Sequence, residues 1–258
     1  MKTIHPLTLA AIVSTLFITS SPLRAADTDD RIESSAAKSY VFKTYLKDDS
    51  IKVESKAGAV TLTGSVAEDS HKTLAENTVS SLPGVTSVND QLTVVGTQPP
   101  EHSDAWITTK VKTALLFHRN VSATGTSVTT VGGIVTLTGV ADSMAQKELT
   151  TEYAKDIDNV KSVDNQMTIT TTPATPSATL GDKIDDASIT AQVKSTLLSH
   201  RSTSALHTSV STTDGVVTLG GIAKNDAERS LVTKLATDIT GVVSVVNNMT
   251  IAVPDIAK

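Results

Sequence analysis

The sequence predicts three tandem α+β domains, each with the order α-β-β-α-β and two helices on one face of a three-stranded mixed sheet. Three observations predict this class: a glycine-bounded strand motif occurs three times, amphipathic segments surround each occurrence, and proline-containing stretches separate the copies. The motif reads Gly58-Ala-Val-Thr-Leu-Thr-Gly64, then Gly133-Ile-Val-Thr-Leu-Thr-Gly139, then Gly215-Val-Val-Thr-Leu-Gly-Gly221.

The three copies are offset by 75 and then by 82 residues. Without gaps, residues 104–169 match residues 186–251 at 35 of 66 positions, which indicates duplication of one unit. We place the domains at 29–96, 103–171 and 185–254, joined by linkers at 97–102 and 172–184. The second linker is rich in proline and threonine, so we expect semi-rigid spacers between separate domains, although its length also permits copies two and three to pack together.

The first helix of each copy is predicted from apolar residues spaced four apart. In copies two and three an aspartate stands before them as a helix cap. The positions are Asp104, Ile107, Val111 and Leu115 in copy two, and Asp186, Ile189, Val193 and Leu197 in copy three. Copy one gives a weaker pattern, Ala36, Tyr40, Phe42 and Leu46. The segment between its first helix and its first strand is then about five residues shorter than in the other copies.

Two strands follow, joined by a turn that contains the first motif glycine: Gly58, Gly133 or Gly215. A glycine in that place is typical of a hairpin turn that needs a positive φ. The second motif glycine, which is Gly64, Gly139 or Gly221, indicates a close approach of backbone or a sharp exit from the strand.

The second helix has the clearest pattern, since its apolar residues form one stripe in both copies two and three. The stripe consists of Ala145, Leu149, Tyr153 and Ile157, and of Ala227, Leu231, Leu235 and Ile239. Gly84, Asn159 and Gly241 come next, and these two residue types best tolerate the left-handed position that ends a helix. A third strand, such as 242–253, completes the unit.

The N-terminus has the layout of a secretory signal peptide at 1–26: Lys2, an apolar stretch from Leu7 to Thr19, and small residues at Ala25 and Ala26. Cleavage after either alanine leaves 20 basic and 27 acidic residues, a formal charge of −7, with no transmembrane anchor in the mature chain. That charge disfavours nucleic acid as a partner. The chain has no cysteine, which excludes disulfides, thiol catalysis and lipoprotein attachment.

These residues resemble the BON domain family of bacterial envelope proteins. The resemblance rests on the repeated G-x-V-T-L-x-G hairpin, the amphipathic helix after it, and the G-V-x-x-V-x-N-x-(L/M)-T-(V/I) ending, and it covers the mature chain except the linkers. It implies α-β-β-α-β folds, residence in the periplasm, and binding to phospholipid or envelope surfaces, often under osmotic stress. The motif glycines define the fold and carry no catalytic role.

The sequence predicts no enzyme, no cofactor and no metal site. It lacks the phosphate-loop, dinucleotide-binding and nucleophile-elbow patterns. The histidines of the mature chain, which are His71, His102, His118, His200 and His207, include no pair at metal-binding helical spacing. The residues common to the three copies are glycines and apolar core positions, whereas repetition itself favours multivalent binding.

Six residues are candidates for contact with lipid or a protein partner: Trp106, Phe117, His118, Arg119, His200 and Arg201. The two His-Arg pairs occupy equivalent places after an apolar pair at the end of the first helix. The simpler interpretation is that they balance the helix dipole, and the functional one is that the arginines hold a phosphate while apolar residues enter lipid. Trp106 and Phe117 align with serines, so they suit either membrane insertion or a contact between domains.

We therefore expect a non-catalytic periplasmic protein that binds phospholipid or envelope surfaces peripherally, or envelope proteins, and supports envelope integrity under osmotic or other stress. The main alternative is a periplasmic chaperone or adaptor whose sheet edges or helix faces bind protein partners.

Overall fold

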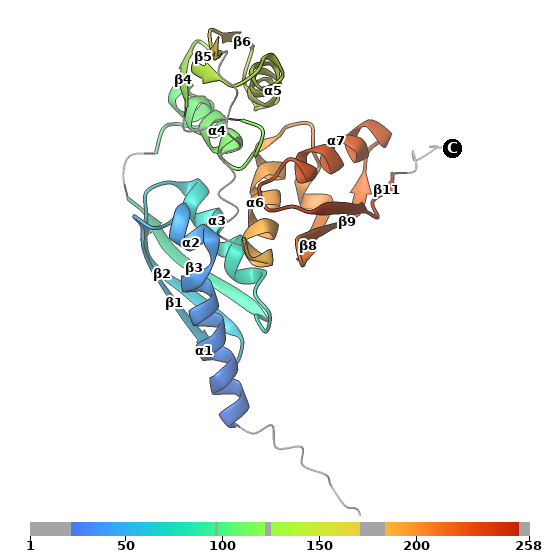
Figure 1. Cartoon of the computed structure of the whole chain (residues 1–258). Coiled ribbons are helices and arrows are strands. Elements are labelled where there is room, and N and C mark those ends of the chain that lie inside the picture. Colours follow the sequence, from blue (N-terminus) through green and yellow to red (C-terminus); the bar gives the residue numbers. More distant parts are fainter. Residues whose placement is uncertain (1–21, 96–97, 122–124, 171–183, 253–258) are drawn as a thin grey trace, which may run out of the picture.

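The structure is a computed structural model that describes residues 22–95, 98–121, 125–170 and 184–252. Each of the three copies forms the predicted α+β domain, with helices on one face of a small mixed sheet (Figure 1). Most of the predicted signal peptide and nearly all of the second linker lie outside the described residues. Within the described ranges, no helix has the length and apolar character needed to cross a membrane.

The elements of the three domains follow one plan, with the first helix of domain one divided in two. Domain one consists of α1 (Pro22–Lys38), α2 (Tyr40–Thr44), β1 (Ser50–Lys56), β2 (Ala59–Val66), α3 (Asp69–Ser80) and β3 (Ser87–Val94). Domain two consists of α4 (Asp104–Leu116), β4 (Thr126–Val131), β5 (Ile134–Ala141), α5 (Met144–Lys155), β6 (Ser162–Asn165) and β7 (Thr168–Ile169). Domain three consists of α6 (Asp186–Ser199), η1 (Ala205–His207), β8 (Thr208–Thr213), β9 (Val216–Ala223), α7 (Asp226–Thr237), β10 (Ser244–Asn247) and β11 (Thr250–Ile251).

The second strand of each domain is central in its sheet. It pairs antiparallel with the first strand across the hairpin and parallel with the third, because the second helix carries the chain back to the same end. In domains two and three the third strand divides at Asn165 and Asn247, whose side chains accept a hydrogen bond from the backbone two residues on. The same side chains donate to the second helix, which explains the asparagine of the N-x-M-T ending.

The hairpin turn and the in-strand glycine have different geometric reasons. At the turn, Asp214 and Gly215 take φ values of 50° and 76°, as a two-residue primed turn requires. Gly139 lies inside β5 rather than at its end and has a φ of 129°. A Cβ there would lie 2.0 Å from the carbonyl oxygen of Gly125, so only glycine fits this close approach of backbone.

An aspartate at the start of the first helix ties that helix to the hairpin. The carboxylate of Asp104 accepts hydrogen bonds from the backbone of Gly132 and Gly133, at 2.7 and 2.8 Å. Helix capping, the role expected of Asp104 and Asp186, falls instead to the residues before them, Ser103 and Asp185.

The first helix of copy one differs from the prediction. Asp29 makes the same hairpin contact as Asp104, at the same separation of 29 residues from the turn glycine. The helix therefore begins earlier and buries Ile32 and Ala36 in the core, and the length from this aspartate to the turn glycine is the same in copies one and two. The misassignment came from Tyr40 and Phe42, which belong to the short helix α2 after a break at Ser39.

The second helix buries the later part of its predicted stripe. Tyr153 and Ile157, and likewise Leu235 and Ile239, are buried, whereas Ala145 and Ala227 are exposed. The hydrophobic core of each domain is thus formed by three parts: the C-terminal half of the second helix, the first helix, and the central strand.

The domains pack together instead of standing apart as separate units. Every residue of α6 from Ala187 to Leu197 is buried except Lys194, because α3 of domain one covers the face that domain three leaves open (Figure 1). The N-terminus of α2 also bonds to domain three, through Tyr40 to Asp185 at 2.7 Å and Val41 to Ser188 at 3.0 Å. The expectation of spaced domains on linkers is wrong for the described residues.

Candidate functional site

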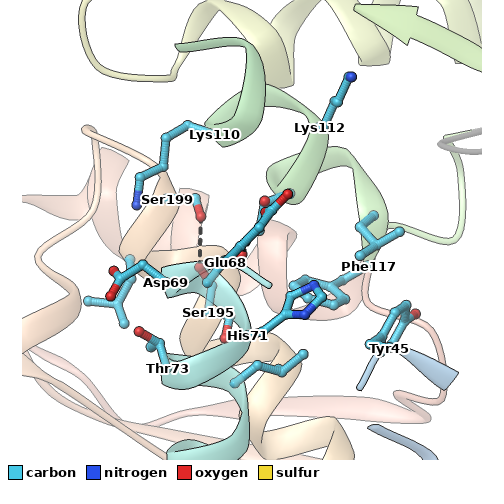
Figure 2. A pocket seen from close by; sticks show the side chains of 15 residues that line it. Tyr45, Glu68, Asp69, His71, Thr73, Lys110, Lys112, Phe117, Ser195 and Ser199 are labelled. Atoms are coloured by element: carbon cyan, nitrogen blue, oxygen red, sulfur yellow. Dashed lines mark hydrogen bonds between the residues drawn. The ribbon is translucent and has the colours of Figure 1, made fainter. Parts of the chain in front are cut away.

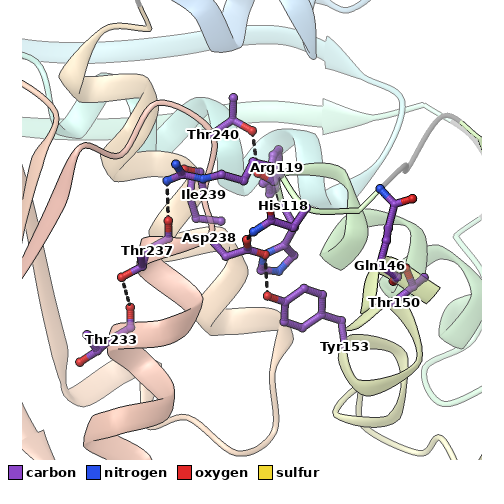
Figure 3. Close-up of polar contacts among 12 residues, drawn as sticks. His118, Arg119, Gln146, Thr150, Tyr153, Thr233, Thr237, Asp238, Ile239 and Thr240 are labelled. Atoms are coloured by element: carbon purple, nitrogen blue, oxygen red, sulfur yellow. Dashed lines mark hydrogen bonds and ion pairs between the residues drawn. The ribbon is translucent and has the colours of Figure 1, made fainter. Parts of the chain in front are cut away.

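The His-Arg pairs lie in one junction between domains two and three, shown from the Arg119 side in Figure 3. Each pair contacts the C-terminal end of the second helix of the other domain. The Arg119 guanidinium donates to the carbonyl oxygens of Ile239 and Val242, at 2.8 and 2.9 Å, and also to that of Thr237. Thr237 is the last residue of α7 and the other two residues follow it, so the arginine lies at the C-terminal end of the helix and balances the negative end of its dipole.

His118 is the most buried member of the junction, with a fully buried side chain. Its ring stacks on Tyr153 of its own domain at a centroid distance of 3.8 Å, and its Nδ1 lies 3.1 Å from Asp238 Oδ2 of domain three. Tyr153 donates to the same carboxylate oxygen at 2.6 Å. Burial holds the pKa of His118 below its ordinary value, and the nearby Asp238 carboxylate only partly offsets this.

The opposite half of the junction repeats these contacts with the domains exchanged. His200 Nδ1 lies 2.9 Å from Asp156 Oδ2, and Arg201 donates to the carbonyl oxygen of Lys155 at 2.9 Å. Burial opposes ionisation of Asp156, but hydrogen bonds from His200 and Ser202 and the charge of Arg201 hold its pKa below the ordinary value. The junction is thus reciprocal, with the same surface used by both domains.

Sequence reasoning found the two His-Arg pairs but missed their partners. Asp156 and Asp238 are separated by the same 82 residues as the pairs themselves, and each precedes an isoleucine. In copy one the equivalent positions hold Lys43 and Thr44 in place of the pair, and Ser81 in place of the aspartate. The His-Arg pair and the aspartate are both present in copies two and three and both missing in copy one. This joint occurrence was the signal that could have identified the junction.

Trp106 and Phe117 have different environments. Phe117 is buried and packs edge-to-face on Tyr45 of domain one at 5.1 Å, so it joins two domains. Trp106 is partly exposed on α4, with the Lys110 ammonium 5.4 Å from its ring centroid. Contact of the six candidates with lipid or a partner stays a prediction; Arg119 and Arg201 remain exposed enough to take part while they hold the junction.

A cavity of about 420 Å³ lies where the three domains meet, and we call it the three-domain groove (Figure 2). One wall is the start of α3 in domain one, a second is α4 in domain two, and a third is the end of α6 in domain three. Its charged lining residues are Glu68, Asp69, Lys110 and Lys112, and His71 also lines it. A smaller cavity of about 280 Å³ shares Glu68, Asp69 and Lys110 with it and extends to Trp106.

The described residues contain no group of three or more potential metal ligands from histidine, cysteine, aspartate and glutamate. His71, which lines the groove, is already engaged, since its Nδ1 lies 2.7 Å from Asp49 Oδ2.

Comparisons with known proteins agree with this architecture. The family model described as BON domain matches residues 28–96, 103–171 and 185–253. Osmotically-inducible protein Y of Escherichia coli is 34% identical over 146 residues, 57% of this chain and 71% of that protein. An uncharacterised protein of Anaplasma centrale is 29% identical over 144 residues, covering 56% of this chain and 91% of that one.

Among solved structures, one of CdsD, a structural protein of the type III secretion system of Chlamydia trachomatis, aligns with 82% of this chain and 90% of its own. Its sequence identity is 17% and its TM-score is 0.24. A similarity at that level carries no argument about function.

Proposed function

This chain belongs to the BON domain family, and from that premise we propose that it is a periplasmic, non-catalytic protein that binds phospholipid or envelope surfaces. Its similarity to an osmotically inducible protein supports a role in envelope integrity under osmotic stress. The three domains act as one packed unit, so the binding residues of different copies are presented together.

One observation carries the proposal: the junction gathers Arg119 and Arg201, 82 residues apart in sequence, around one pair of histidines. The rings of His118 and His200 are 6.1 Å apart at their centroids. The Arg201 side chain keeps 48% of its surface exposed, and Leu198, on the same helix end, is 49% exposed. A basic group beside an exposed apolar side chain suits the phosphate and acyl region of a lipid surface.

The test is co-sedimentation of the mature protein with phosphatidylglycerol vesicles and with purely zwitterionic vesicles, at low and high salt. We expect binding to the anionic vesicles that weakens with salt, since exposed charges are screened within about 8 Å at physiological ionic strength. Replacing Arg119 and Arg201 together by alanine should weaken that binding several-fold.

The matched control is the double replacement of Arg31 and Arg229 by alanine, which removes the same charge from exposed places on α1 and α7. If both double variants lose binding equally, net charge rather than the junction is responsible. If wild-type protein binds neither vesicle, the proposal of lipid binding is wrong.

A second candidate function is that of a chaperone or adaptor, which the open sheet face of domain two favours. Val131, Ile134 and Val140 are exposed there, Val131 to 77%. An apolar sheet face of this kind suits an unfolded or partner protein. This function predicts that the protein suppresses aggregation of an unfolded client without lipid, and that Val131→Lys reduces the suppression.

A further inference from the structure

We infer that domain one closes reversibly over helix α6 of domain three. The packed arrangement is the closed state of the molecule, and in the open state domain one separates while domains two and three stay joined. Such a motion goes beyond the proposed function, since it follows from how the domains pack and holds whichever surface the protein binds.

The face of α6 that domain one covers is polar. Gln192 is fully buried there, and neither atom of its side-chain amide has a hydrogen-bond partner among the described residues. Its equivalent in copy two, Lys110, is partly exposed, and α3 makes most of the contacts of α6 outside its own domain. Domain one therefore buries this amide, and the closed state bears a cost that water would remove in the open state.

The contact between α3 and α6 contains no specific polar interaction. Neither an ion pair nor a hydrogen bond joins these two helices, both of which lie within the described residues. Burial lowers the pKa of Lys194 on α6, and the charge of Glu76 on α3 only partly offsets this. An ammonium group that loses water without gaining an ion pair adds to the cost of the closed state.

Two residues at the N-terminus of α6 hold α2 of domain one, and we call Asp185 and Ser188 the latch. The carboxylate of Asp185 caps α6 by accepting from the Ser188 N–H at 2.9 Å, and it also accepts from the Tyr40 N–H at 2.7 Å. The Oγ of Ser188 accepts from the Val41 N–H at 3.0 Å. Domain three thus satisfies two N–H groups that α2 leaves without a partner at its own start.

The junction between domains two and three is held by more and stronger contacts. Both arginines donate to carbonyl oxygens, and the backbone N–H of each donates to an aspartate of the other domain, at 2.9 and 3.0 Å. The Nε2 atoms of His118 and His200 have no partner, but each ring faces a carboxylate through its Nδ1, whereas neither amide atom of Gln192 has a partner. Domain one is therefore the domain that separates first.

Opening would change the exposure of apolar side chains in domain two. Phe117 is 2% exposed in the closed state, and the ring of Tyr45 from domain one packs against it. Leu116 lies next to it in sequence, and the equivalent Leu198 of domain three is already 49% exposed. When domain one separates, Phe117 loses the Tyr45 contact, so domain one covers part of an apolar surface in the closed state.

The experiment measures opening by the reactivity of one introduced cysteine, since the chain has none of its own. Gln192→Cys places a thiol on the face that domain one covers. Thr196→Cys is the matched control, because Thr196 is buried on the same helix and its equivalent Ala114 is buried in domain two as well. The mature protein with either cysteine is treated with iodoacetamide under native conditions and followed by mass spectrometry. We expect the Gln192→Cys protein to react at least about tenfold faster, because the control thiol needs domain three to unfold.

The latch is tested with Asp185→Ser. Serine is the capping residue at this place in copy two, so the change keeps α6 capped but removes the acceptor of the Tyr40 N–H. We expect it to speed the reaction of Gln192→Cys about tenfold and to leave Thr196→Cys unchanged, since a hydrogen bond to a charged group is lost only from the closed state. Asn225→Ser is the control, because it also introduces the capping residue of copy two, at the start of α7.

Equal reactivity of the two cysteines would overturn the inference, because the face of α6 would then be uncovered only on unfolding. Acceleration of both cysteines by Asp185→Ser, no acceleration of either, or an equal effect of Asn225→Ser would contradict the latch. Arg119→Ala removes donors from the junction and should leave the reactivity of Gln192→Cys unchanged. If it speeds that reaction as much as Asp185→Ser does, domain one does not separate on its own and the inference is wrong.

Discussion

At the scale of single residues, one aspartate of each first helix ties that helix to the hairpin turn. Asp29, Asp104 and Asp186 all accept hydrogen bonds from backbone N–H groups of the hairpin turn. These contacts hold the turn in its left-handed conformation and fix the helix against the sheet. Hydrogen bonds from uncharged donors to a carboxylate are among the stronger ones in proteins.

We expect Asp186→Ala to lower the free energy of unfolding by about 1–3 kcal/mol, because two turn N–H groups lose a charged acceptor. Urea unfolding measures this. The control is Asp226→Ala, which removes an aspartate from the first turn of α7 whose side chain is 80% exposed and pairs with Arg229. That change should cost less than about 1 kcal/mol, and equal losses would contradict the role given to Asp186.

At the scale of elements, equivalent helices have different surroundings. Ser188, Gln192, Ser195 and Ser199 of α6 correspond by the 82-residue offset to Trp106, Lys110, Thr113 and Phe117 of α4. The small and uncharged side chains let α6 pack against α3, and the larger set on α4 borders the grooves. The duplication thus preserved each domain while the outer face of the first helix diverged.

The contact of Arg119 with the C-terminal end of α7 leads to a prediction about how domains two and three are held together. Arg119→Ala should leave the three domains folded but loosen domain two from domain three, since three carbonyls near the end of α7 lose their donor. Hydrogen exchange at residues 237–242 should become several-fold faster. Arg229→Ala, on the exposed surface of the same helix, should leave exchange there unchanged; the prediction is wrong if both variants behave alike.

At the scale of the whole molecule, the junction makes the packing of domains depend on pH. His118 faces Asp238, Tyr153 and His200, and burial keeps its pKa low. In a separated or unfolded state the imidazole would protonate near its ordinary pKa of about 6.5. Above that pH both states are neutral at this residue, so it adds no pH dependence; below it, only the open state gains the proton.

Stability should therefore fall as the pH is lowered from about 6.5, by at most about 1.4 kcal/mol per pH unit for this one group, until the lowered pKa of the packed state is reached. Denaturation curves between about pH 7.5 and 5 measure the slope. His118→Gln should flatten it relative to His207→Gln, an exposed control. Identical slopes in the two variants would show that His118 does not link pH to stability.

The fold class followed from local pattern. Glycine positions, stripes of apolar residues and the repeated motif report on contacts inside one domain, and these are encoded within some 65 neighbouring residues. The same reasoning failed at the first helix of copy one, because Tyr40 and Phe42 mimic a continuing helix where Ser39 breaks it. Sequence comparison did find the His-Arg pairs, because they occur at equivalent positions in two copies.

What only the tertiary structure decided is how the domains meet. Ser188, Gln192 and Ser195 have the composition of a solvent-facing stripe, yet they are buried because another domain covers them. The partners of the arginines are backbone carbonyls, which carry no sequence signature, and the walls of the groove come from three domains. The sequence by itself determined each unit, since the core of a unit is built from its own residues; the contacts between units depend on surface shape and on backbone groups that every residue possesses.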